Sequence, residues 1–366
     1  MNQVLYRKYR PQGFSEFTAQ NHVIQTLKNE IESGKIAHAY LFSGHRGTGK
    51  TTMARLFAKA INCQNRKGFE PCNECTSCLE ISKGSAVDII EIDAASNRGI
   101  DDIRSLRDSI RYKPNLLKYK VIILDEAHQL SKDAANALLK ILEEPPEYVV
   151  FILATTEAHK MISTIASRCQ RFDFYKLTIK EIVSKLEEIA KEENIKVEKE
   201  ALEMIAASSE GSLRDAEGLL DQILNFTSSN EIKIEDVKEI LGVVDLTLVF
   251  EFTDFLIEKN IPMAIKYLNE NVERGINLEE FSKTITNYLR KLLILKINGG
   301  LVDEIAVGET GETKQKMTEQ AEKLEGEDLK TILNLFLEAE NKRKYSSIPQ
   351  LPFELALVDY FYQAKK

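Results

Sequence analysis

The eight residues from Gly44 to Thr51, Gly-His-Arg-Gly-Thr-Gly-Lys-Thr, constrain the fold of this 366-residue chain more than any other segment. They follow the apolar run 39–42 and match the pattern G-x-x-x-x-G-K-[ST] of a loop that joins a strand to a helix. Its glycines let backbone N–H groups turn inward around a phosphate, and the helix N-terminus adds partial positive charge. Lys50 would reach the β- and γ-phosphates, and the Thr51 hydroxyl would bind Mg²⁺. The sequence therefore predicts a nucleoside triphosphate site formed by Gly44, His45, Arg46, Gly47, Thr48, Gly49, Lys50, Thr51 and Thr52.

Short apolar runs, each followed by a helical pattern, make up the first half of the chain. They predict buried strands at 39–42, 87–92, 120–124 and 149–154. Such alternation is typical of a parallel sheet with helices on both faces and ligands at the carboxyl ends of the strands. Beyond about residue 176 the strand signal disappears and only amphipathic helical patterns continue. We therefore expect an α/β domain at 1–175, a small helical domain at 176–242 and a larger helical domain at 243–366, since a chain of this length is too long for one core.

Two carboxylates, Asp125 and Glu126, directly follow the apolar run Val121-Ile122-Ile123-Leu124. A buried strand that delivers carboxylates to the edge of the sheet is the expected partner of the phosphate loop. Asp125 would hold Mg²⁺ through water, and Glu126 would orient or deprotonate the attacking water. An acidic strand end exposed to solvent is the alternative, and the presence of the loop makes it the weaker explanation.

Three further positions are candidates for contact with the γ-phosphate. A hydroxyl at the tip of the strand 149–154, from Thr155 or Thr156, could bond the phosphate or the attacking water. Arg168 closes the helix after that strand, and Arg214 opens a helix in the second domain. Guanidinium groups neutralise the charge of a departing phosphate. On spacing alone, ordinary strand-end packing and surface ion pairs remain alternatives, and for either arginine the ion pair is the commoner role.

Four of the five cysteines, Cys63, Cys72, Cys75 and Cys78, lie directly after the loop helix with the spacing C-x8-C-x2-C-x2-C. In a cytosolic chain this clustering favours a metal over disulfides. Two C-x2-C turns point three thiolates at one centre, and Cys63 supplies a fourth, which predicts a closed, structural Zn²⁺ site. An iron–sulfur cluster is the alternative, although the C-x3-C-P continuation typical of such clusters is absent. We expect Cys169 to be a buried thiol and not a ligand.

The front of the chain is basic, with 19 Lys/Arg against 12 Asp/Glu in residues 1–120 of a protein whose net charge is −8. This asymmetry suits nucleic-acid contact, although a nucleotide site plus solvated surface charge explains it equally well. Ser96, Asn97 and Arg98 precede a helix whose N-terminus could bind a nucleic-acid phosphate, with a plain solvated helix face as the alternative. The longest apolar run has only strand length and no signal peptide precedes it, so we expect a cytoplasmic protein without membrane contact.

These motifs together resemble the gamma/tau subunits of bacterial DNA polymerase III, the clamp loader ATPases of the AAA+ superfamily. The resemblance covers essentially the whole chain. Cysteines directly after the loop helix separate this family from eukaryotic clamp loader ATPases and from other AAA+ relatives. The segments that carry the resemblance are Arg7-Lys8-Tyr9-Arg10-Pro11 with Phe14 and Phe17, the loop through Thr52, the four cysteines, Glu91-Ile92-Asp93-Ala94-Ala95-Ser96, Asp125-Glu126-Ala127-His128-Gln129-Leu130-Ser131, Leu138-Leu139-Lys140 with Glu143-Glu144-Pro145-Pro146, Ala154-Thr155-Thr156-Glu157, Ser167-Arg168-Cys169 and Gly211-Ser212-Leu213-Arg214-Asp215-Ala216.

The resemblance implies roles that spacing does not. Arg168 would act in trans on ATP bound by the neighbouring subunit, Arg214 would touch the ATP of its own chain, and Thr155 would be the sensor at the strand tip. Arg10, Pro11 and Val23 would line the adenine pocket. The family fold is an α/β P-loop AAA+ module with an inserted zinc module at 63–78, a small helical lid and an all-α collar. The implied cofactors are ATP, Mg²⁺ and Zn²⁺.

The implied activity is ATP hydrolysis that opens a sliding clamp and loads it onto primer-template DNA. The implied partners are the delta and delta-prime subunits, further copies of the same chain, the clamp and the DNA. Two departures are Ala19, where the family usually has Gly, and the lack of the tau-type extension after 366, so polymerase and helicase contacts are not assigned. A DEAH-type helicase, suggested by Asp125-Glu126-Ala127-His128, would need a second α/β domain that the helical second half does not offer. A scaffold that binds ATP as a switch without essential hydrolysis remains the alternative function.

Overall fold

The structure is a computed structural model, and it describes residues 4–97, 99–227, 231–242, 245–306 and 311–363. The chain forms two compact units, Met1–Val237 and Lys238–Lys366. Each unit is described by itself below. The division of the chain into three domains at 175/176 and 242/243 stays a prediction.

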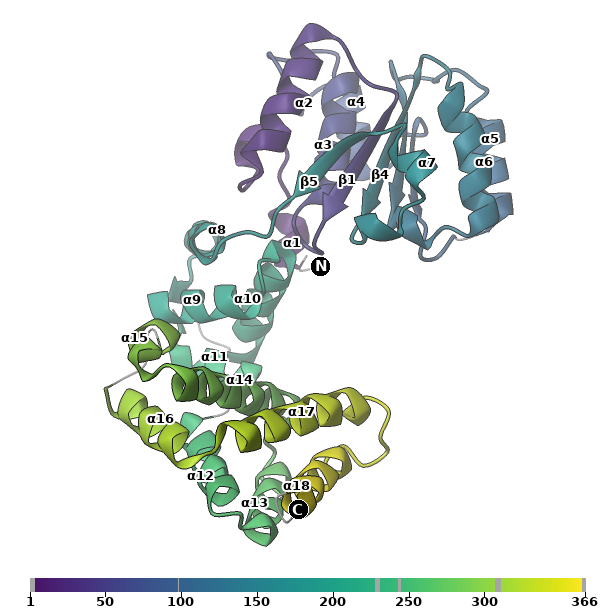
Figure 1. The fold of residues 1–366 in the computed structure, drawn as a ribbon. Helices are drawn as coiled ribbons and strands as arrows, with labels where there is room; N and C mark the ends of the chain where they lie inside the picture. Colours follow the sequence, from purple (N-terminus) through teal and green to yellow (C-terminus); the bar gives the residue numbers. More distant parts are fainter. Residues whose placement is uncertain (1–3, 98, 228–230, 243–244, 307–310, 364–366) are drawn as a thin grey trace. The chain divides into compact units, whose positions relative to one another are not determined.

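A five-stranded parallel sheet in the order β2-β3-β4-β1-β5 forms the centre of the first unit (Figure 1). The expected parallel α/β fold is confirmed, with all four predicted strands present. The strands are β1 (Ala39–Gly44), β2 (Ile89–Asp93), β3 (Lys120–Asp125), β4 (Val149–Thr155) and β5 (Gln170–Phe174).

The fifth strand, β5, was not expected from the sequence. It pairs only with β1, at the edge of the sheet. Its residues Gln-Arg-Phe-Asp-Phe alternate, with Phe172 and Phe174 buried against Phe42 and Gln170 and Arg171 exposed. An edge strand covered on one side lacks the continuous apolar run by which the central strands were found.

Helices cover both faces of the sheet, as predicted. The helices α2 (Asn21–Ser33) and α3 (Lys50–Asn62) pack with alternate strand residues such as Tyr40 and Phe42. On the other face α5 (Ile100–Ser109), α6 (Lys132–Glu143) and α7 (Ser163–Ala166) pack with the intervening strand residues. The Ser131 side chain caps α6, because it accepts a hydrogen bond from the backbone N–H of Ala134.

The remainder of the first unit is mainly helical. Thr178 and Glu181 form a capping box that starts α8. The expectation of no strand beyond 176 is wrong, because two-residue strands β6 (Lys196–Val197) and β7 (Glu231–Ile232) pair in parallel; such short strands leave no periodic pattern. The other elements are α1 (Leu5–Lys8), α4 (Thr76–Lys83), α8 (Ile179–Glu192), α9 (Lys199–Ser208), α10 (Leu213–Thr227) and the 3₁₀ turns η1 (Phe14–Glu16), η2 (Ala127–Gln129) and η3 (Ala158–Lys160), with α11 (Ile234–Leu241) at the boundary of the units.

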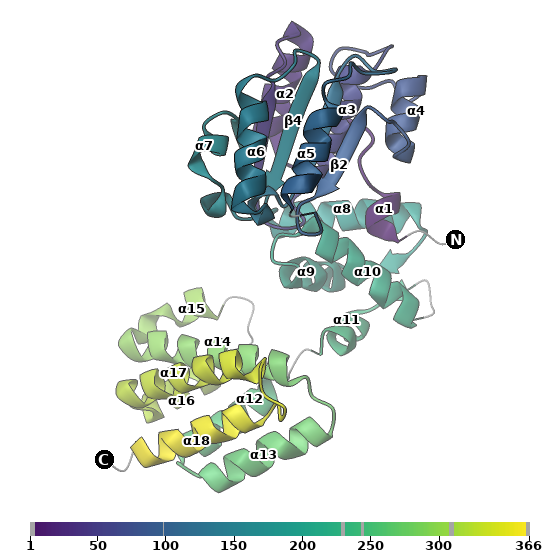
Figure 2. The ribbon, with the colours of Figure 1, turned by 90° about the vertical axis from the view of Figure 1, so that its right-hand side faces the viewer.

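The second unit is all-helical in its described residues, as expected (Figure 2). Its core gathers Phe252, Phe281, Phe336 and Phe353 around the long helix α14. No helix that the structure describes, in either unit, is both long and apolar enough to cross a membrane. The elements of the second unit are α12 (Leu246–Ile257), α13 (Ile261–Glu273), α14 (Leu278–Ile297), η4 (Gly299–Leu301), α15 (Val302–Ile305), α16 (Gly311–Lys323), α17 (Gly326–Arg343) and α18 (Leu351–Gln363).

Candidate nucleotide site and cysteine cluster

The predicted phosphate loop joins β1 to α3 at the carboxyl edge of the sheet. Gly47 and Gly49 have φ of 74° and 98°, in the left-handed region that favours glycine. Neither position has room for a side chain. A Cβ at Gly47 would lie 1.8 Å from the Ser212 hydroxyl oxygen, and one at Gly49 would lie 2.4 Å from the Phe17 ring. The loop is therefore closely surrounded by its own unit, and these glycines are required for both conformation and space.

Lys50 and Thr51 begin α3 and lie where the motif predicts. The Lys50 ammonium group donates to the carbonyl oxygens of Gly44 and His45, at 2.9 and 2.8 Å. Burial lowers the pKa of Lys50, while the carboxylates of Glu126 and Asp125 oppose that shift. The ammonium group is held at the mouth of the loop by two neutral acceptors that an anionic ligand could replace.

The carboxylates at the end of β3 meet the loop directly. The Thr51 hydroxyl donates to Asp125 Oδ2 at 2.7 Å. A hydroxyl and a carboxylate in contact are the hard oxygen donors that Mg²⁺ prefers. Glu126 follows with φ of 47° and its backbone N–H bonds the Asp125 side chain at 3.0 Å. The sheet thus places the Asp125 carboxylate beside the loop and the Glu126 carboxylate one residue further along the chain.

The two threonines at the tip of β4 have different partners. β4 lies between β1 and β3, so its end faces both the loop and the carboxylates. Thr155 is fully buried and its hydroxyl is 2.9 Å from His128 Nδ1. Thr156 instead donates its hydroxyl to Glu126 Oε2 at 2.8 Å, and its backbone N–H points to the same oxygen at 3.2 Å. Thr156 therefore contacts Glu126 in this structure and Thr155 does not, and the role of Thr155 as the sensor stays a prediction.

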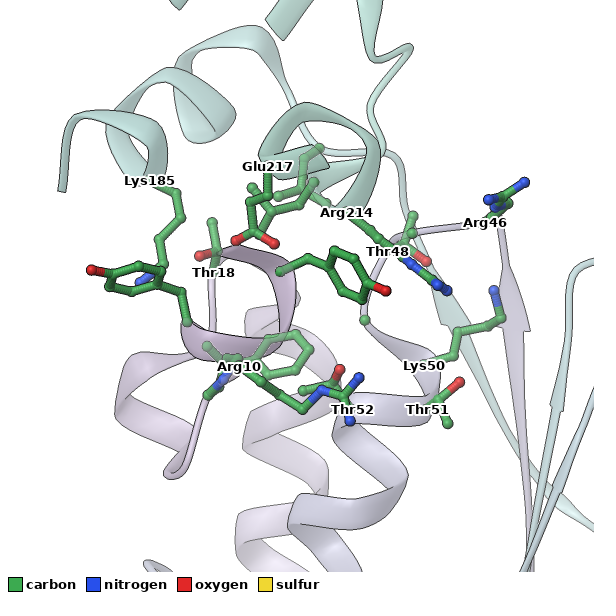
Figure 3. Close-up of a pocket in the computed structure, with 18 of the residues that line it drawn as sticks. Arg10, Thr18, Arg46, Thr48, Lys50, Thr51, Thr52, Lys185, Arg214 and Glu217 are labelled. Atoms are coloured by element: carbon green, nitrogen blue, oxygen red, sulfur yellow. The ribbon is translucent and has the colours of Figure 1, made fainter. Parts of the chain in front are cut away.

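A cavity extends from the loop to the start of the chain and to helices α8 and α10 (Figure 3). Arg10 and Pro11 are among its lining residues, and their place beside an adenine base stays a prediction. Val23 is not among them; it is fully buried in the core beside Leu27. The lining residues are Tyr6, Tyr9, Arg10, Pro11, Phe17, Thr18, Arg46, Gly47, Thr48, Gly49, Lys50, Thr51, Thr52, Asp125, Glu126, Leu177, Lys185, Leu213, Arg214 and Glu217.

The two arginines singled out in the sequence lie in different surroundings. Arg214 lines the cavity, with its guanidinium carbon 4.9 Å from the centre of the Tyr6 ring. This distance allows a cation–π contact. Arg168 is not among the lining residues. It binds Glu143 at 2.8 Å and the backbone carbonyl of Thr164, at the surface.

Glu217 and Lys185 line the cavity and were missed from the sequence. Glu217 lies three residues after Arg214 in α10, so the two share a helix face. Both side chains are buried, with 6% of Glu217 and 8% of Lys185 exposed. Burial raises the pKa of the Glu217 carboxyl to about 7, although Lys185 opposes the shift. An acidic residue three positions after a candidate arginine, on the same face of the expected helix, was the signal in the sequence that could have revealed Glu217.

The four predicted cysteine ligands come together. The Sγ atoms of Cys63, Cys72, Cys75 and Cys78 all lie within 4.8 Å of one another. Sulfurs at the corners of a zinc tetrahedron are separated by roughly 3.8 Å, given Zn–S bonds of about 2.3 Å, and the Cys72 and Cys78 sulfurs are 3.9 Å apart. Cys169 lies outside this cluster, where burial raises its pKa to about 11.

Backbone N–H groups prepare one of these thiols for deprotonation. Hydrogen bonds from the backbone of Glu74 and Cys75 lower the pKa of Cys72 to about 6. The N–H of Cys75 lies 3.3 Å from the Cys72 sulfur. Burial instead raises the pKa of Cys63 and Cys78. Because thiolates and not thiols bind metals, a cation at the centre would have to displace those protons.

The candidate DNA-binding residues are only partly described. Arg98 lies outside the described residues. Ser96 donates its hydroxyl to Asp93 at 2.9 Å, and the Asn97 amide donates to the Asp93 carbonyl at 3.1 Å. Both side chains are exposed, between β2 and α5. The structure thus shows a short exposed turn at this place.

Comparison with known proteins gives one consistent family. Family profiles described as "DNA polymerase III, delta subunit", "DNA polymerase III clamp loader subunit, ATPase lid domain" and "DNA polymerase III subunits gamma and tau domain III" match residues 19–178, 181–229 and 232–365. DNA polymerase III subunit tau of Bacillus subtilis is 43% identical over 97% of this chain, and that of Escherichia coli 38% identical over 97%. DNA polymerase III subunit gamma of Buchnera aphidicola is 35% identical over the whole chain.

The relatives differ in how much of their length is matched. The chain spans 62% of the Bacillus subtilis protein and 55% of the Escherichia coli protein. It spans 99% of the Buchnera aphidicola gamma subunit. The match thus includes a relative that aligns over nearly its whole length.

Proposed function

Because the chain belongs to the gamma/tau family of bacterial DNA polymerase III subunits, in the AAA+ clamp loader group, we propose that it binds and hydrolyses ATP to load a sliding clamp onto primer-template DNA. The contact between Thr51 and Asp125 carries the proposal. It brings the end of the phosphate loop and the end of β3 to one point, with Lys50 and Glu126 beside it. These are the groups that phosphoryl transfer to water requires.

Each of these residues has a distinct task in the proposed reaction. The ammonium group of Lys50 would leave its two carbonyl acceptors and bind the β- and γ-phosphates. Thr51 and Asp125 would hold Mg²⁺, which when bound neutralises phosphate charge. Glu126, oriented by Thr156, would accept a proton from the attacking water as the water oxygen bonds to the γ-phosphorus and the bond from that phosphorus to the bridging oxygen breaks, so that ADP leaves. Arg214 would bind the phosphates of the same chain's ATP.

Arg168 is proposed to act on the ATP of a neighbouring subunit. Its position outside the cavity lining and its exposed pair with Glu143 support a role away from its own site. A mixture of Arg168→Ala chains with Glu126-inactivated chains tests this, because each variant could then supply what the other lacks. Recovery of hydrolysis in mixed assemblies is expected. A variant that instead loses ATP affinity in its own chain would contradict the role in trans.

The cysteine cluster is proposed to hold a structural Zn²⁺. Four thiolates leave no open position for catalysis, so the metal would fix the segment 63–78 against α3. Elemental analysis of the purified protein should give one zinc per chain. Iron in place of zinc would support the cluster alternative.

The partners follow from the family and are proposed with it. They are the delta and delta-prime subunits, further copies of this chain through the helical second unit, the clamp, and DNA contacted near Ser96 to Arg98. The replication role would place the protein in the cytoplasm with the chromosome. The steady-state ATPase rate, measured for the chain mixed with these partners, should rise when clamp and primed DNA are added. No stimulation by DNA would contradict clamp loading, and loading that persists without hydrolysis would favour the ATP-switched scaffold.

A further inference from the structure

Glu217 lies at the end of the cavity that is remote from the phosphate loop. Figure 3 shows Glu217 and Lys185 on the side of Thr18, whereas Lys50 and Thr51 lie on the opposite side. Both groups of residues line the same cavity. If the phosphates occupy the loop, the part of the nucleotide that reaches Glu217 is the base.

The Glu217 carboxyl has no hydrogen bond and no ion pair with any residue in the described ranges. Only 6% of the residue is exposed, and its side chain points into the cavity (Figure 3). Lys185, whose positive charge opposes the rise in the pKa of Glu217, is itself bonded to Glu188 at 2.9 Å. A carboxylate that opens to the cavity loses its water when a ligand fills that cavity, and a ligand that supplies a hydrogen bond in exchange recovers part of that cost.

We propose that Glu217 selects the base of the bound nucleotide by accepting a hydrogen bond from the 6-amino group of adenine. The inference rests on the proposed binding of nucleotide at the loop. Adenine carries an amino donor at this position, whereas guanine and hypoxanthine carry a carbonyl oxygen. An oxygen facing the carboxyl would leave two acceptors opposed in a buried site. Glu217 thus acts as a specificity-determining residue and takes no part in the hydrolysis step.

The test compares ADP, IDP and GDP binding to the full chain with Mg²⁺ by calorimetry at about pH 8.5, where the Glu217 carboxyl is ionised and can only accept. IDP differs from ADP at the 6-position without adding the 2-amino group of GDP. We expect ADP to bind roughly 10- to 100-fold more tightly than IDP or GDP, the range for a hydrogen bond to a charged group. Equal affinity for ADP and IDP would overturn the inference, and so would a preference for GDP. Failure to bind any of the three would contradict the proposed nucleotide site itself, which keeps the two failures distinct.

Variants of the same helix locate the effect. Glu217→Leu should bring the ADP and IDP affinities to within about threefold of each other, and so should Glu217→Gln, because its amide can offer the acceptor oxygen to adenine or the NH2 donor to hypoxanthine. Asp221→Asn is the matched control. Asp221 lies one turn further along α10 and does not line the cavity. An ADP-to-IDP affinity ratio in Glu217→Leu that equals the wild-type ratio would overturn the inference. If that variant does not fold, the comparison of ADP with IDP on the wild-type protein still decides the question.

Discussion

The two ends of the nucleotide cavity differ in how their polar groups are satisfied. At the loop end, Lys50 has two carbonyl acceptors, Thr51 bonds Asp125, and Thr156 bonds Glu126. At the other end, Glu217 is buried and faces the cavity with no bonded partner among the described residues. The carboxylates of the loop end are therefore held in place before a ligand arrives, and Lys50 has only to exchange its carbonyl acceptors for phosphate, whereas the base end is completed by the ligand.

This difference follows from the chemistry each end must perform. Phosphoryl transfer stabilises charge in the transition state, which is most effective when the groups need not reorganise. Base selection depends on the difference between two ligands, and a buried group that only one ligand satisfies gives the larger difference. The arrangement at the loop end lowers the activation barrier to hydrolysis, and the arrangement at the base end disfavours binding of nucleotides with other bases.

Glu126→Gln should give the largest effect and separates chemistry from binding at the loop end. The amide keeps the size of the side chain and its bond to Thr156 but cannot accept the water proton. We expect the steady-state ATPase rate of the assembled complex to fall about 1000-fold, with ADP affinity within twofold of wild type. Glu147→Gln, on an exposed loop, is the control. A rate reduced less than tenfold would mean that Glu126 is not the base.

Glu217→Gln should have the next largest effect, on stability as a function of pH. The folded pKa of Glu217 is about 7, raised by burial from 4.5. The contribution of Glu217 to the free energy of unfolding is therefore fully present below pH 4.5, where the carboxyl is protonated in both states. It is lost as the pH rises through 7, because the buried carboxyl must then ionise. The difference in unfolding free energy between variant and wild type should grow in favour of the variant by about 3 kcal/mol between pH 4.5 and 8.

Urea unfolding followed by circular dichroism measures this difference. The transition to compare is the one whose midpoint shifts when nucleotide is added. The matched control is Glu187→Gln on the exposed face of α8, where the side chain stays in water. A difference for Glu217→Gln that stays flat over this range would mean that the carboxyl is charged and solvated in the free protein. The base end would then be open to water, and its contrast with the loop end would disappear.

Lys50→Ala should weaken the binding of nucleotides by the same factor whichever base they carry. Loss of a charged hydrogen-bond donor to phosphate costs about 3 kcal/mol, so the affinities for ADP, IDP and GDP should all fall roughly 100-fold. Their ratios should stay at the wild-type values. Calorimetry with the same three nucleotides checks this, with Lys132→Ala, exposed at the start of α6, as control. A changed ratio would show that the two ends are coupled.

The loop end could be predicted from the sequence in nearly all its parts, whereas the base end could not. Lys50, Thr51, Asp125 and Glu126 lie in contiguous motifs whose geometry is fixed by the strand or helix that carries them. The base end instead gathers α1, α8 and α10, whose packing no local pattern specifies. Val23 shows the error this causes. It was expected to line the adenine pocket, but it packs with Leu27 in the core and is not among the residues that line the cavity.

Strand tips and edges show the same limit on a smaller scale. Thr155 ends β4 and Thr156 follows it, and which of the two meets Glu126 depends on the pleat at the last residue of the strand. Thr155 points into the protein toward His128, and Thr156 toward Glu126. The edge strand β5 was missed because only one of its faces is apolar. By contrast, the four cysteines needed no knowledge of packing, since their spacing alone brings their sulfurs together.

Tyr6→Leu should have the smallest effect and tests the junction between the two ends. The Tyr6 ring lies 4.9 Å from the Arg214 guanidinium carbon, and both line the cavity. An exposed cation–π contact is worth about 0.5–1 kcal/mol, so loss of the ring should weaken a non-hydrolysable ATP analogue two- to fivefold by releasing Arg214. The same substitution in an Arg214→Met background should have no further effect, because the interaction it removes is already gone. An equal loss in both backgrounds would show that Tyr6 packs on the nucleotide itself, and would assign the ring to the base end and not to the phosphate-binding arginine.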